Sequence, residues 1–162
     1  MIRVLEEDQP LRRISELRMS KKEHDSSPEW IFACRSGRWV GYITDKPLKN
    51  LPVQHWDKER LSDHMRPLHE LPSIGENTLL WKAVLDLEKS SDGRLLVFNL
   101  AGLPSGILDR TNIGQAVLKQ LGLDVPPALI QMSKSQNSYP LDIALPRVVE
   151  GMLSAGIVDL PN

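Results

Sequence analysis

The stretch RLLVFNLAGLPSGILD, residues 94–109, places apolar β-forming residues on both sides of a short turn that contains Gly102. An earlier stretch, WIFACRSGRWVGYIT, residues 30–44, has the same organisation around Gly37. Apolar runs that flank a glycine-containing turn are typical of β-hairpins. We therefore expect two hairpins, the second of which repeats the first 65 residues later, as the spacing of Thr44 and Asp109 shows (109 − 44).

An amphipathic pattern precedes each hairpin. Apolar residues recur at three- and four-residue intervals over residues 5–17 and again over 74–87, at an offset of 69 (74 − 5). Asp8 and Asn77 stand at equivalent positions, and both residue types favour a helix N-cap because their side chains accept an unpaired backbone N–H. The pattern predicts capped helices over residues 9–19 and 78–89.

A second helix is expected after each hairpin, over residues 46–51 and 111–121. The change of offset from 69 to 65 falls in the intervening loop, where HDSSP of the first copy (24–28) is longer than SSDG of the second (90–93). One unit of about sixty residues cannot bury its own sheet, whereas two packed copies can. We therefore expect an α/β (α+β) fold of two βαββα halves related by a pseudo-two-fold axis.

Composition limits the functional classes. The chain has 162 residues, of which 41% are hydrophobic and 25% charged, with a formal net charge of −1. These values are typical of a soluble globular protein and give no field that favours nucleic acid. Cys34 is the only cysteine, which excludes an internal disulfide and a CxxC metal site, and its apolar neighbours predict a buried thiol. A chain without disulfides fits a reducing compartment.

No apolar segment approaches the ~18 to 20 residues that span a bilayer, so we expect no direct membrane insertion of this segment. The opening MIRVLEEDQPL has acidic residues where a signal peptide needs an apolar core. It also begins in the middle of the repeat pattern, which suggests a fragment of a longer protein.

The ordered repeat resembles the CBS domain, and two copies in tandem resemble a CBS pair (Bateman module). The resemblance covers residues 1 to about 120 and is better in the second copy, where Met65-Arg66-Pro67 is similar to the opening strand of that family. The first copy lacks this strand. The repeat predicts three segments: a first CBS repeat with its linker (1–58), a second repeat (59–121) and a helical C-terminal extension (122–162).

The resemblance implies an adenosine nucleotide, AMP, ADP or ATP, bound as a regulatory ligand, with no cofactor required. The family pattern G-h-x-[ST]-x-x-D places a hydroxyl and a carboxylate one turn apart at a strand-to-helix junction, where the Asp can accept from the ribose hydroxyls while the helix N-terminus helps with phosphate. In the first copy Thr44 matches the hydroxyl and Asp45 follows it, but Pro47 occupies the carboxylate position. The first site is therefore expected to be weak.

In the second copy Asp109 replaces the hydroxyl residue and Asn112 the carboxylate. Both side chains accept hydrogen bonds, so they could hold a ribose, with Arg110 or Arg94 near phosphate. The alternative is that Asp109 or Asn112 only caps the following helix. Met65 and Pro67, from the opening-strand motif, complete the candidate ligand-binding residues.

Other chemistry finds no support. His55, His64 and His69 lie near Asp57, Asp63 and Glu70, but their spacing lacks the HExxH geometry of a metal site, and Pro67 interrupts any helix between them. No nucleophile elbow, Walker loop or dinucleotide-binding motif occurs. We therefore expect no catalytic residue, no metal and no enzymatic activity in this chain. Trp39 and Trp81 are expected in the core, and Trp56 at the seam between the copies or at an interface.

The C-terminal extension is punctuated by prolines and predicts amphipathic helices over 127–136 and 146–155, with Pro146 in the first turn of the latter and Gly156 as its stop. This extension and the linker TDKPLKNLPVQHWDKERLSDH resemble the soluble C-terminal region of cyanobacterial membrane-embedded metalloproteases of the site-2 protease family. The resemblance implies a zinc protease core elsewhere in a membrane protein, with this fragment tethered on the cytosolic side. The HExxH motif is absent here.

Two functions follow. The first is a regulatory module that senses an adenine nucleotide for an attached membrane protease, and the second is a ligand-free dimerisation or protein-interaction module. We expect a homodimer that buries more than ~1,000 Å² through residues 78–89 and 111–121, or through the last helix. The helix at 111–121 offers Ile113, Ala116, Val117 and Gln120, and the last helix adds Val149, Met152 and Leu153. The alternative is a monomer whose C-terminal extension folds back over this stripe.

Overall fold

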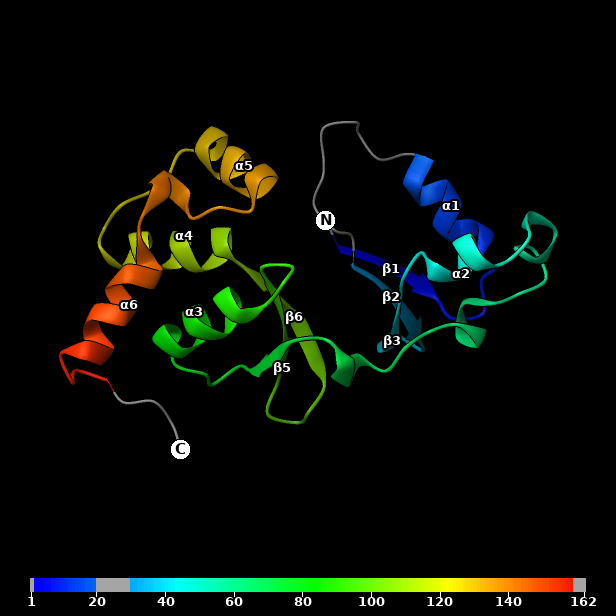
Figure 1. The fold of residues 1–162 in the computed structure, drawn as a ribbon, viewed down its shortest axis with the longest axis horizontal. Coiled ribbons are helices and arrows are strands. Elements are labelled where there is room, and N and C mark those ends of the chain that lie inside the picture. The colour runs from blue at the N-terminus through cyan, green and yellow to red at the C-terminus, as the bar shows by residue number, and fades with distance from the viewer. Residues whose placement is uncertain (1, 20–29, 159–162) are drawn as a thin grey trace. The chain divides into compact units, whose positions relative to one another are not determined.

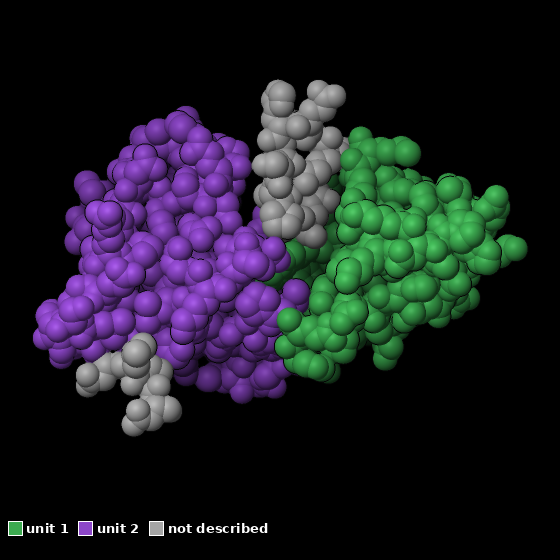
Figure 2. Space-filling model, in the orientation of Figure 1, with its two compact units in different colours: residues 1–70 green, residues 71–162 purple. Residues whose placement is uncertain are grey.

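The computed structural model describes residues 2–19 and 30–158 of the chain. The chain divides into two compact units, residues 1–70 and 71–162 (Figures 1 and 2). The predicted repeat boundary between residues 58 and 59 lies inside the first unit. The loop at 24–28, to which the change of offset was assigned, lies outside the described residues.

The first unit contains a three-stranded sheet in the order β1-β2-β3. Its elements are β1 (Ile2–Glu6), α1 (Arg12–Met19), β2 (Trp30–Arg35), β3 (Arg38–Ile43), α2 (Lys46–Asn50) and the short 3₁₀ turns Val53–His55, Leu61–Asp63 and Leu68–Glu70. β1 pairs with β2 in parallel, and β2 pairs with β3 antiparallel. The core is formed by apolar side chains of the sheet, α1 and the linker, namely Leu11, Ile14, Ile31, Ala33, Ile43 and Leu61.

The second unit repeats this arrangement and then extends it. Its elements are β4 (Ser73–Gly75), α3 (Leu80–Lys89), β5 (Arg94–Phe98), β6 (Pro104–Asp109), α4 (Arg110–Gln120), α5 (Pro127–Gln136), a 3₁₀ turn at Pro140–Asp142 and α6 (Leu145–Ser154). The sheet order is β4-β5-β6, with a parallel and then an antiparallel pair. The order strand, helix, two strands, helix is therefore the same in both units, and the predicted α/β class with two βαββα repeats is confirmed.

Both hairpins form where the sequence predicts them, and glycine explains the first turn. Ser36 and Gly37 connect β2 to β3 with φ of 51° and 77°. Two consecutive residues with positive φ are the signature of the type I′ turn, whose twist matches the right-handed twist of paired strands. In the second hairpin, Asn99 Oδ1 accepts hydrogen bonds from the backbone N–H groups of Ala101 and Leu103, each at 3.0 Å.

The predicted N-cap role of Asp8 is wrong. α1 begins at Arg12, and Asp8 lies in the preceding turn. The backbone between them pairs instead with the linker: Leu61 N–H donates to the carbonyl of Gln9 at 2.9 Å, and Leu11 N–H donates to that of Glu59 at 3.0 Å. Because this segment is held in an extended pairing, the helix cannot begin at Asp8.

The N-cap role of Asn77 is also wrong. The N-cap of α3 is Leu79, with extended backbone and no side-chain capping bond. Glu76 N–H donates to the Phe98 carbonyl at 2.8 Å, so the chain still follows the sheet at residue 76. The helix can therefore begin only after this segment leaves β5.

The opening strand expected at Met65-Arg66-Pro67 does not join the second sheet. Arg66 forms an isolated bridge with Tyr42 of β3, through reciprocal backbone hydrogen bonds of 2.8 and 3.0 Å. The second sheet opens at β4 and the first at β1, in the same parallel pairing. The family motif thus adds an edge contact to the first sheet.

The two predicted C-terminal helices are confirmed as α5 and α6. α6 packs on α3, where Val149 is 4% exposed and Leu153 lies against the same core (Figure 1). Gly156 ends α6 with φ of 71°, as expected for a C-terminal stop. None of the helices in residues 2–19 and 30–158 is long and apolar enough to cross a bilayer.

The predicted burial of Cys34 and of the tryptophans can be compared with the structure. Cys34 is buried, and this burial is the first cause that raises the pKa of its thiol, followed by the neighbouring Glu6. Trp39 is half-buried and stacks on Phe32 with ring centres 4.3 Å apart. Trp56, for which a position at the seam between the copies or at an interface is predicted, packs against the core of the first unit, and its indole N–H donates to the Leu51 carbonyl at 3.2 Å.

Trp81 is half-buried and lies against the core of the second unit, as expected.

Candidate functional site

The junction between β6 and α4 carries the candidate ribose-binding pair. Asp109 is the N-cap of α4, and its Oδ1 accepts a hydrogen bond from Asn112 N–H at 2.8 Å. In return, Asn112 Oδ1 accepts from Asp109 N–H at 3.1 Å. This reciprocal capping box confirms the capping alternative, because it satisfies backbone donors that the helix leaves unpaired. Whether the pair also binds a ligand stays a prediction.

One carboxylate oxygen of Asp109, Oδ2, takes no part in the capping box. Only Oδ1 and the backbone N–H of Asp109 take part in the capping box, and within the described ranges Oδ2 accepts no hydrogen bond. A half-buried acceptor at the start of an eleven-residue helix is suited to a ligand hydroxyl. Capping and ligand binding are therefore compatible in one residue.

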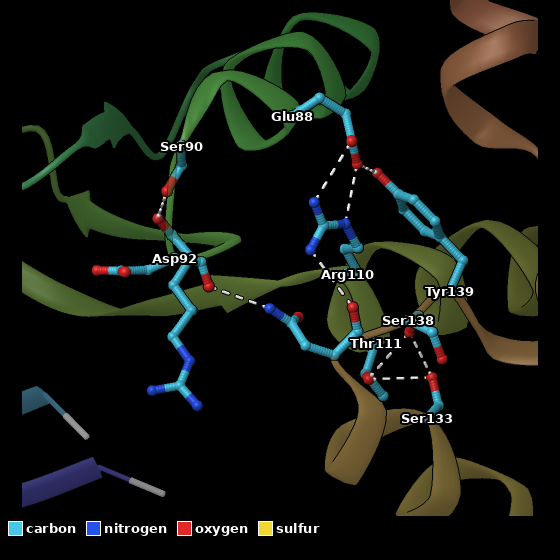
Figure 3. Close-up of polar contacts among 10 residues, drawn as sticks. Glu88, Ser90, Asp92, Arg110, Thr111, Ser133, Ser138 and Tyr139 are labelled. Atoms are coloured by element: carbon cyan, nitrogen blue, oxygen red, sulfur yellow. Dashed lines mark hydrogen bonds and ion pairs between the residues drawn. The ribbon is translucent and has the colours of Figure 1, made fainter. Parts of the chain in front are cut away.

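Arg110 faces the C-terminal extension (Figure 3). Its Nε and Nη2 donate to the two carboxylate oxygens of Glu88 on α3 at 2.9 and 3.3 Å, and its Nη1 donates to the Asn137 carbonyl at 3.3 Å. The Tyr139 hydroxyl donates to Glu88 Oε1 at 2.8 Å. Arg110, which is expected to bind phosphate, is thus already engaged in a bidentate ion pair, and bidentate pairs are among the strong side-chain hydrogen bonds.

The ionisation of this cluster follows from its geometry. The hydrogen bonds from Arg110 are the first cause that lowers the pKa of Glu88 below its ordinary value of 4.5; burial opposes the shift and Tyr139 supports it. Burial, and then the bond to Glu88, raise the pKa of Tyr139. At neutral pH, Glu88 is therefore an anion that accepts from a cationic guanidinium and a protonated phenol.

A buried hydroxyl cluster lies next to this ion pair (Figure 3). Thr111 is 0% exposed and its Oγ1 lies 3.1 Å from the Oγ of Ser133 on α5. The Ser133 hydroxyl also donates to the Ser138 carbonyl at 2.6 Å. Sequence reasoning missed these residues, because Thr111 and Ser133 are 22 positions apart and no local pattern pairs them.

Two glycines permit the close approach of the extension. A Cβ on Gly114, in the middle of α4, would overlap Pro140 Cδ. A Cβ on Gly93, which has φ of 63°, would overlap the side chains of Arg110 and Asn137. Asn137 in turn donates from its amide to the Asp92 carbonyl at 3.0 Å. A mid-helix glycine is costly, so Gly114 is explained by the packing of Pro140.

A pocket of about 470 Å³ adjoins this cluster inside the second unit. It is lined by Glu88 and Arg110 and by residues of the extension, among which are Tyr139, Asp142 and Arg147. Asp142 and the preceding Leu141 have φ of 52° and 57°, an unusual conformation for residues other than glycine. The pocket is therefore lined by charges of both signs.

The remaining second-copy candidate is Arg94, which begins β5. It is 9% exposed and stands opposite Asp109 in the strand register. The other two candidates lie in the first unit: Met65 packs against its core, and Pro67 is exposed. Asp109, Arg110 and Asn112 thus lie within four residues at one helix start, whereas Met65 and Pro67 flank the bridge to the edge of the first sheet.

The first-copy candidates are held by local ion pairs. Asp45 Oδ2 lies 3.0 Å from Arg18 Nη1 and 3.2 Å from Lys49 Nζ. Burial raises the pKa of Asp45, but the hydrogen bond from Lys49 and the charge of Arg18 together outweigh burial, so the pKa is lowered overall. Thr44 Oγ1 accepts from Lys46 N–H at 3.4 Å, and Pro47 stands in the first turn of the five-residue α2.

The linker histidines form no metal centre in the described ranges, where no group of three or more histidine, cysteine or acidic residues could hold an ion. His64 lies 3.3 Å from Glu59. The acidic neighbours have other partners: Asp57 pairs with Arg12, Asp63 caps a short turn and Glu70 pairs with Arg66.

Comparison with known proteins gives the class of fold. No protein-family model and no curated protein sequence matches the chain. Among solved structures, a cystathionine beta-synthase pair domain from Shewanella oneidensis MR-1, described as part of a proposed Mg²⁺ transporter, superposes with a TM-score of 0.51 at 15% identity, over 75% of this chain and 67% of that one. The chain therefore has the fold of a CBS-domain pair.

Two further solved structures are similar at lower scores. The CBS-pair protein CBSX2 of Arabidopsis thaliana has a TM-score of 0.49 at 20% identity, over 75% of this chain and 89% of that one. The CBS domain of a bacterial CNNM/CorC family Mg²⁺ transporter in complex with ATP has a TM-score of 0.47 at 16% identity, over 77% and 81%.

Proposed function

We propose that this chain is a regulatory CBS-pair module that binds an adenine nucleotide, AMP, ADP or ATP, at the start of α4. The observation that carries the proposal is the position of Asp109. It stands at the hydroxyl position of the CBS pattern, three residues before Asn112 at the ribose-binding position, and its Oδ2 takes no part in the capping box. The dipole of an eleven-residue helix favours phosphate at the same end.

Calorimetric titration with AMP, ADP and ATP, followed by thermal unfolding, tests this function. A nucleotide at a hundred times its dissociation constant stabilises the folded state by about 2.7 kcal/mol. Asp109→Ala combined with Asn112→Ala removes both candidate ribose acceptors, so the double variant should abolish binding, and its thermal unfolding checks that it still folds. Asp124→Ser, at an exposed position beyond α4, is the matched control and should bind as wild type does. Wild-type affinity in this double variant would show that the site lies elsewhere.

The parent protein is the second part of the proposal. The sequence resemblance of the linker and the C-terminal extension to site-2 protease family proteins supports a module tethered on the cytosolic side of a membrane metalloprotease. Fractionation of cells that express the full-length protein tests this. Recovery of the module in the membrane fraction, on a polypeptide that carries an HExxH zinc motif, is expected. A stand-alone polypeptide in the soluble fraction would exclude it.

A ligand-free interaction module is the second candidate function, and exposed apolar residues favour it. α6 covers the inner face of α3, and two residues of the predicted dimer surface, Ile113 and Val149, are 1% and 4% exposed in the core of the second unit, so they cannot supply the contact. Leu79 and Leu80 at the start of α3 are nevertheless 64% and 46% exposed, and Val148 of α6 is 55% exposed. We propose a homodimer through these outer faces. Light scattering during size-exclusion chromatography should give twice the chain mass of 18.3 kDa.

A mass of one chain across micromolar concentrations would exclude the homodimer. Leu80→Lys is the sharper variant, because a charge at the centre of an apolar contact should shift a dimer to monomer. Val53→Lys, at an exposed apolar position of the first unit, is its control.

A further inference from the structure

We infer that Arg110 couples nucleotide binding at the start of α4 to the docking of the C-terminal extension, so that the extension reports occupancy of the site. The inference rests on the proposed function, in which Arg110 lies near the phosphate. It adds the route by which binding would be transmitted. Of the C-terminal extension, the structure describes residues 122–158.

Residues 109–112, at the start of α4, form two kinds of contact. Asp109 and Asn112 form the capping box, where the nucleotide is expected. Arg110 and Thr111 stand between them and contact the extension, Arg110 at the Asn137 carbonyl and Thr111 at the Ser133 hydroxyl. Arg110 also pairs with Glu88 of α3. Residues that are consecutive on one helical turn cannot move independently, so a ligand on one pair acts on the other.

Arg110 is the group for which two partners compete. Its Nε, Nη1 and Nη2 all donate within the cluster, to Glu88 and to the Asn137 carbonyl. Two of the five guanidinium N–H groups, one on Nη1 and one on Nη2, are not used in these bonds, and a phosphate that accepts from them draws the guanidinium away from Glu88 and Asn137.

The position of Asn137 makes the extension sensitive to this competition. Asn137 ends α5 with φ of 47°, and its side chain is anchored on the Asp92 carbonyl. The space around it is tight, since a Cβ on Gly93 would overlap both Asn137 and Arg110. Withdrawal of Arg110 therefore removes a donor from a crowded, conformationally unusual residue. Local opening is expected there first.

Coupling between two sites is reciprocal in free energy. If nucleotide binding loosens the extension, then weakening the hold of Glu88 on Arg110 must strengthen nucleotide binding. Glu88→Gln removes the negative charge but keeps an oxygen that can accept from Tyr139. Asp86→Asn is the matched control: it makes the same charge change on the same helix, where the Asp86 side chain pairs with Lys82.

The experiment measures ATP affinity by calorimetry for the wild type, Glu88→Gln and Asp86→Asn, together with amide hydrogen exchange of the full chain with and without ATP. Glu88→Gln should bind ATP on the order of 5-fold or more tightly than wild type, and Asp86→Asn should be unchanged. ATP should accelerate exchange in wild type at the amide of Ser138, which bonds to the Ser133 carbonyl at 3.0 Å.

The outcomes separate this inference from the proposed function. If wild type binds ATP and Glu88→Gln binds it equally or more weakly, the coupling is wrong and the nucleotide site stands. If both variants gain affinity equally, the effect is one of net charge and the coupling is again wrong. If neither wild type nor Glu88→Gln binds any nucleotide, the proposed function fails and this inference fails with it.

Discussion

Gly114 of α4 lies directly against Pro140 of the C-terminal extension, so closely that a single methyl group on the glycine would overlap the proline ring. Pro140 is fully buried at this contact. The extension is therefore packed into the second unit rather than appended to it, and this contact can be tested by one substitution.

Gly114→Ala should destabilise the protein by roughly 1–3 kcal/mol, because the added methyl overpacks the contact with Pro140. Helix propensity alone would predict a gain of about 0.5–1 kcal/mol. Gly151→Ala is the matched control, since it lies inside α6 with no atom within 4 Å of the new Cβ and should show that gain. Urea unfolding measures both. Equal stabilisation of the two variants would mean that Pro140 does not pack on α4.

Thr111→Val should cost roughly 1–2 kcal/mol, because it removes the buried partner of the Ser133 hydroxyl without changing side-chain volume much. Ser135→Ala, on the exposed side of the same helix as Ser133, should change the free energy of unfolding by less than about 0.5 kcal/mol. A double-mutant cycle with Ser133→Ala isolates the pair. Strict additivity of Thr111→Val and Ser133→Ala would argue against the contact.

Acid should weaken the second unit through Glu88. The pKa of Glu88 is lowered in the folded state, first by Arg110, so the stability it contributes is complete above its ordinary pKa of 4.5. That contribution is lost as the pH falls below 4.5 and through the folded-state pKa. Glu88→Gln should therefore lose less stability than wild type on acidification from neutral pH, as measured by urea unfolding. Parallel pH profiles for the two proteins would contradict this assignment.

The thiol of Cys34 should be inert in the folded protein. Burial raises its pKa and shields it from reagent, so the reactive thiolate is scarce at neutral pH. Labelling with a thiol-specific chromogenic reagent should be on the order of tenfold slower or more in buffer than in concentrated urea, where one thiol per chain should react. Rapid native labelling would place Cys34 at the surface.

Much of the fold was predictable because its signals are local. Paired apolar runs around Gly37 and Gly102 predict the hairpins, since turn geometry depends on a few adjacent residues. The capping box of Asp109 and Asn112 was one of the two alternatives for the same reason, as its partners are three residues apart. Duplication of these local patterns was enough to indicate the CBS-pair fold.

The predictions that failed depended on contacts distant in sequence. Asp8 is a suitable N-cap residue, but pairing of the Gln9 backbone with Leu61 delays the helix. Asn77 fails because Glu76 stays bonded to Phe98. In both cases a long-range backbone pairing overrides the local preference of a capping side chain.

The sequence by itself determined the repeated elements, the turns and the helix cap of the second copy, because each follows from residues within a few positions. Only the tertiary structure decided that Arg110 bonds to Glu88 and Asn137, 22 and 27 residues away. Ion pairs of this kind follow from which surfaces the packed helices bring together, and no periodicity encodes them. The partners of Arg110 at the candidate site therefore follow from the tertiary fold, whereas the position of the candidate residues at a strand-to-helix junction could be predicted from the sequence.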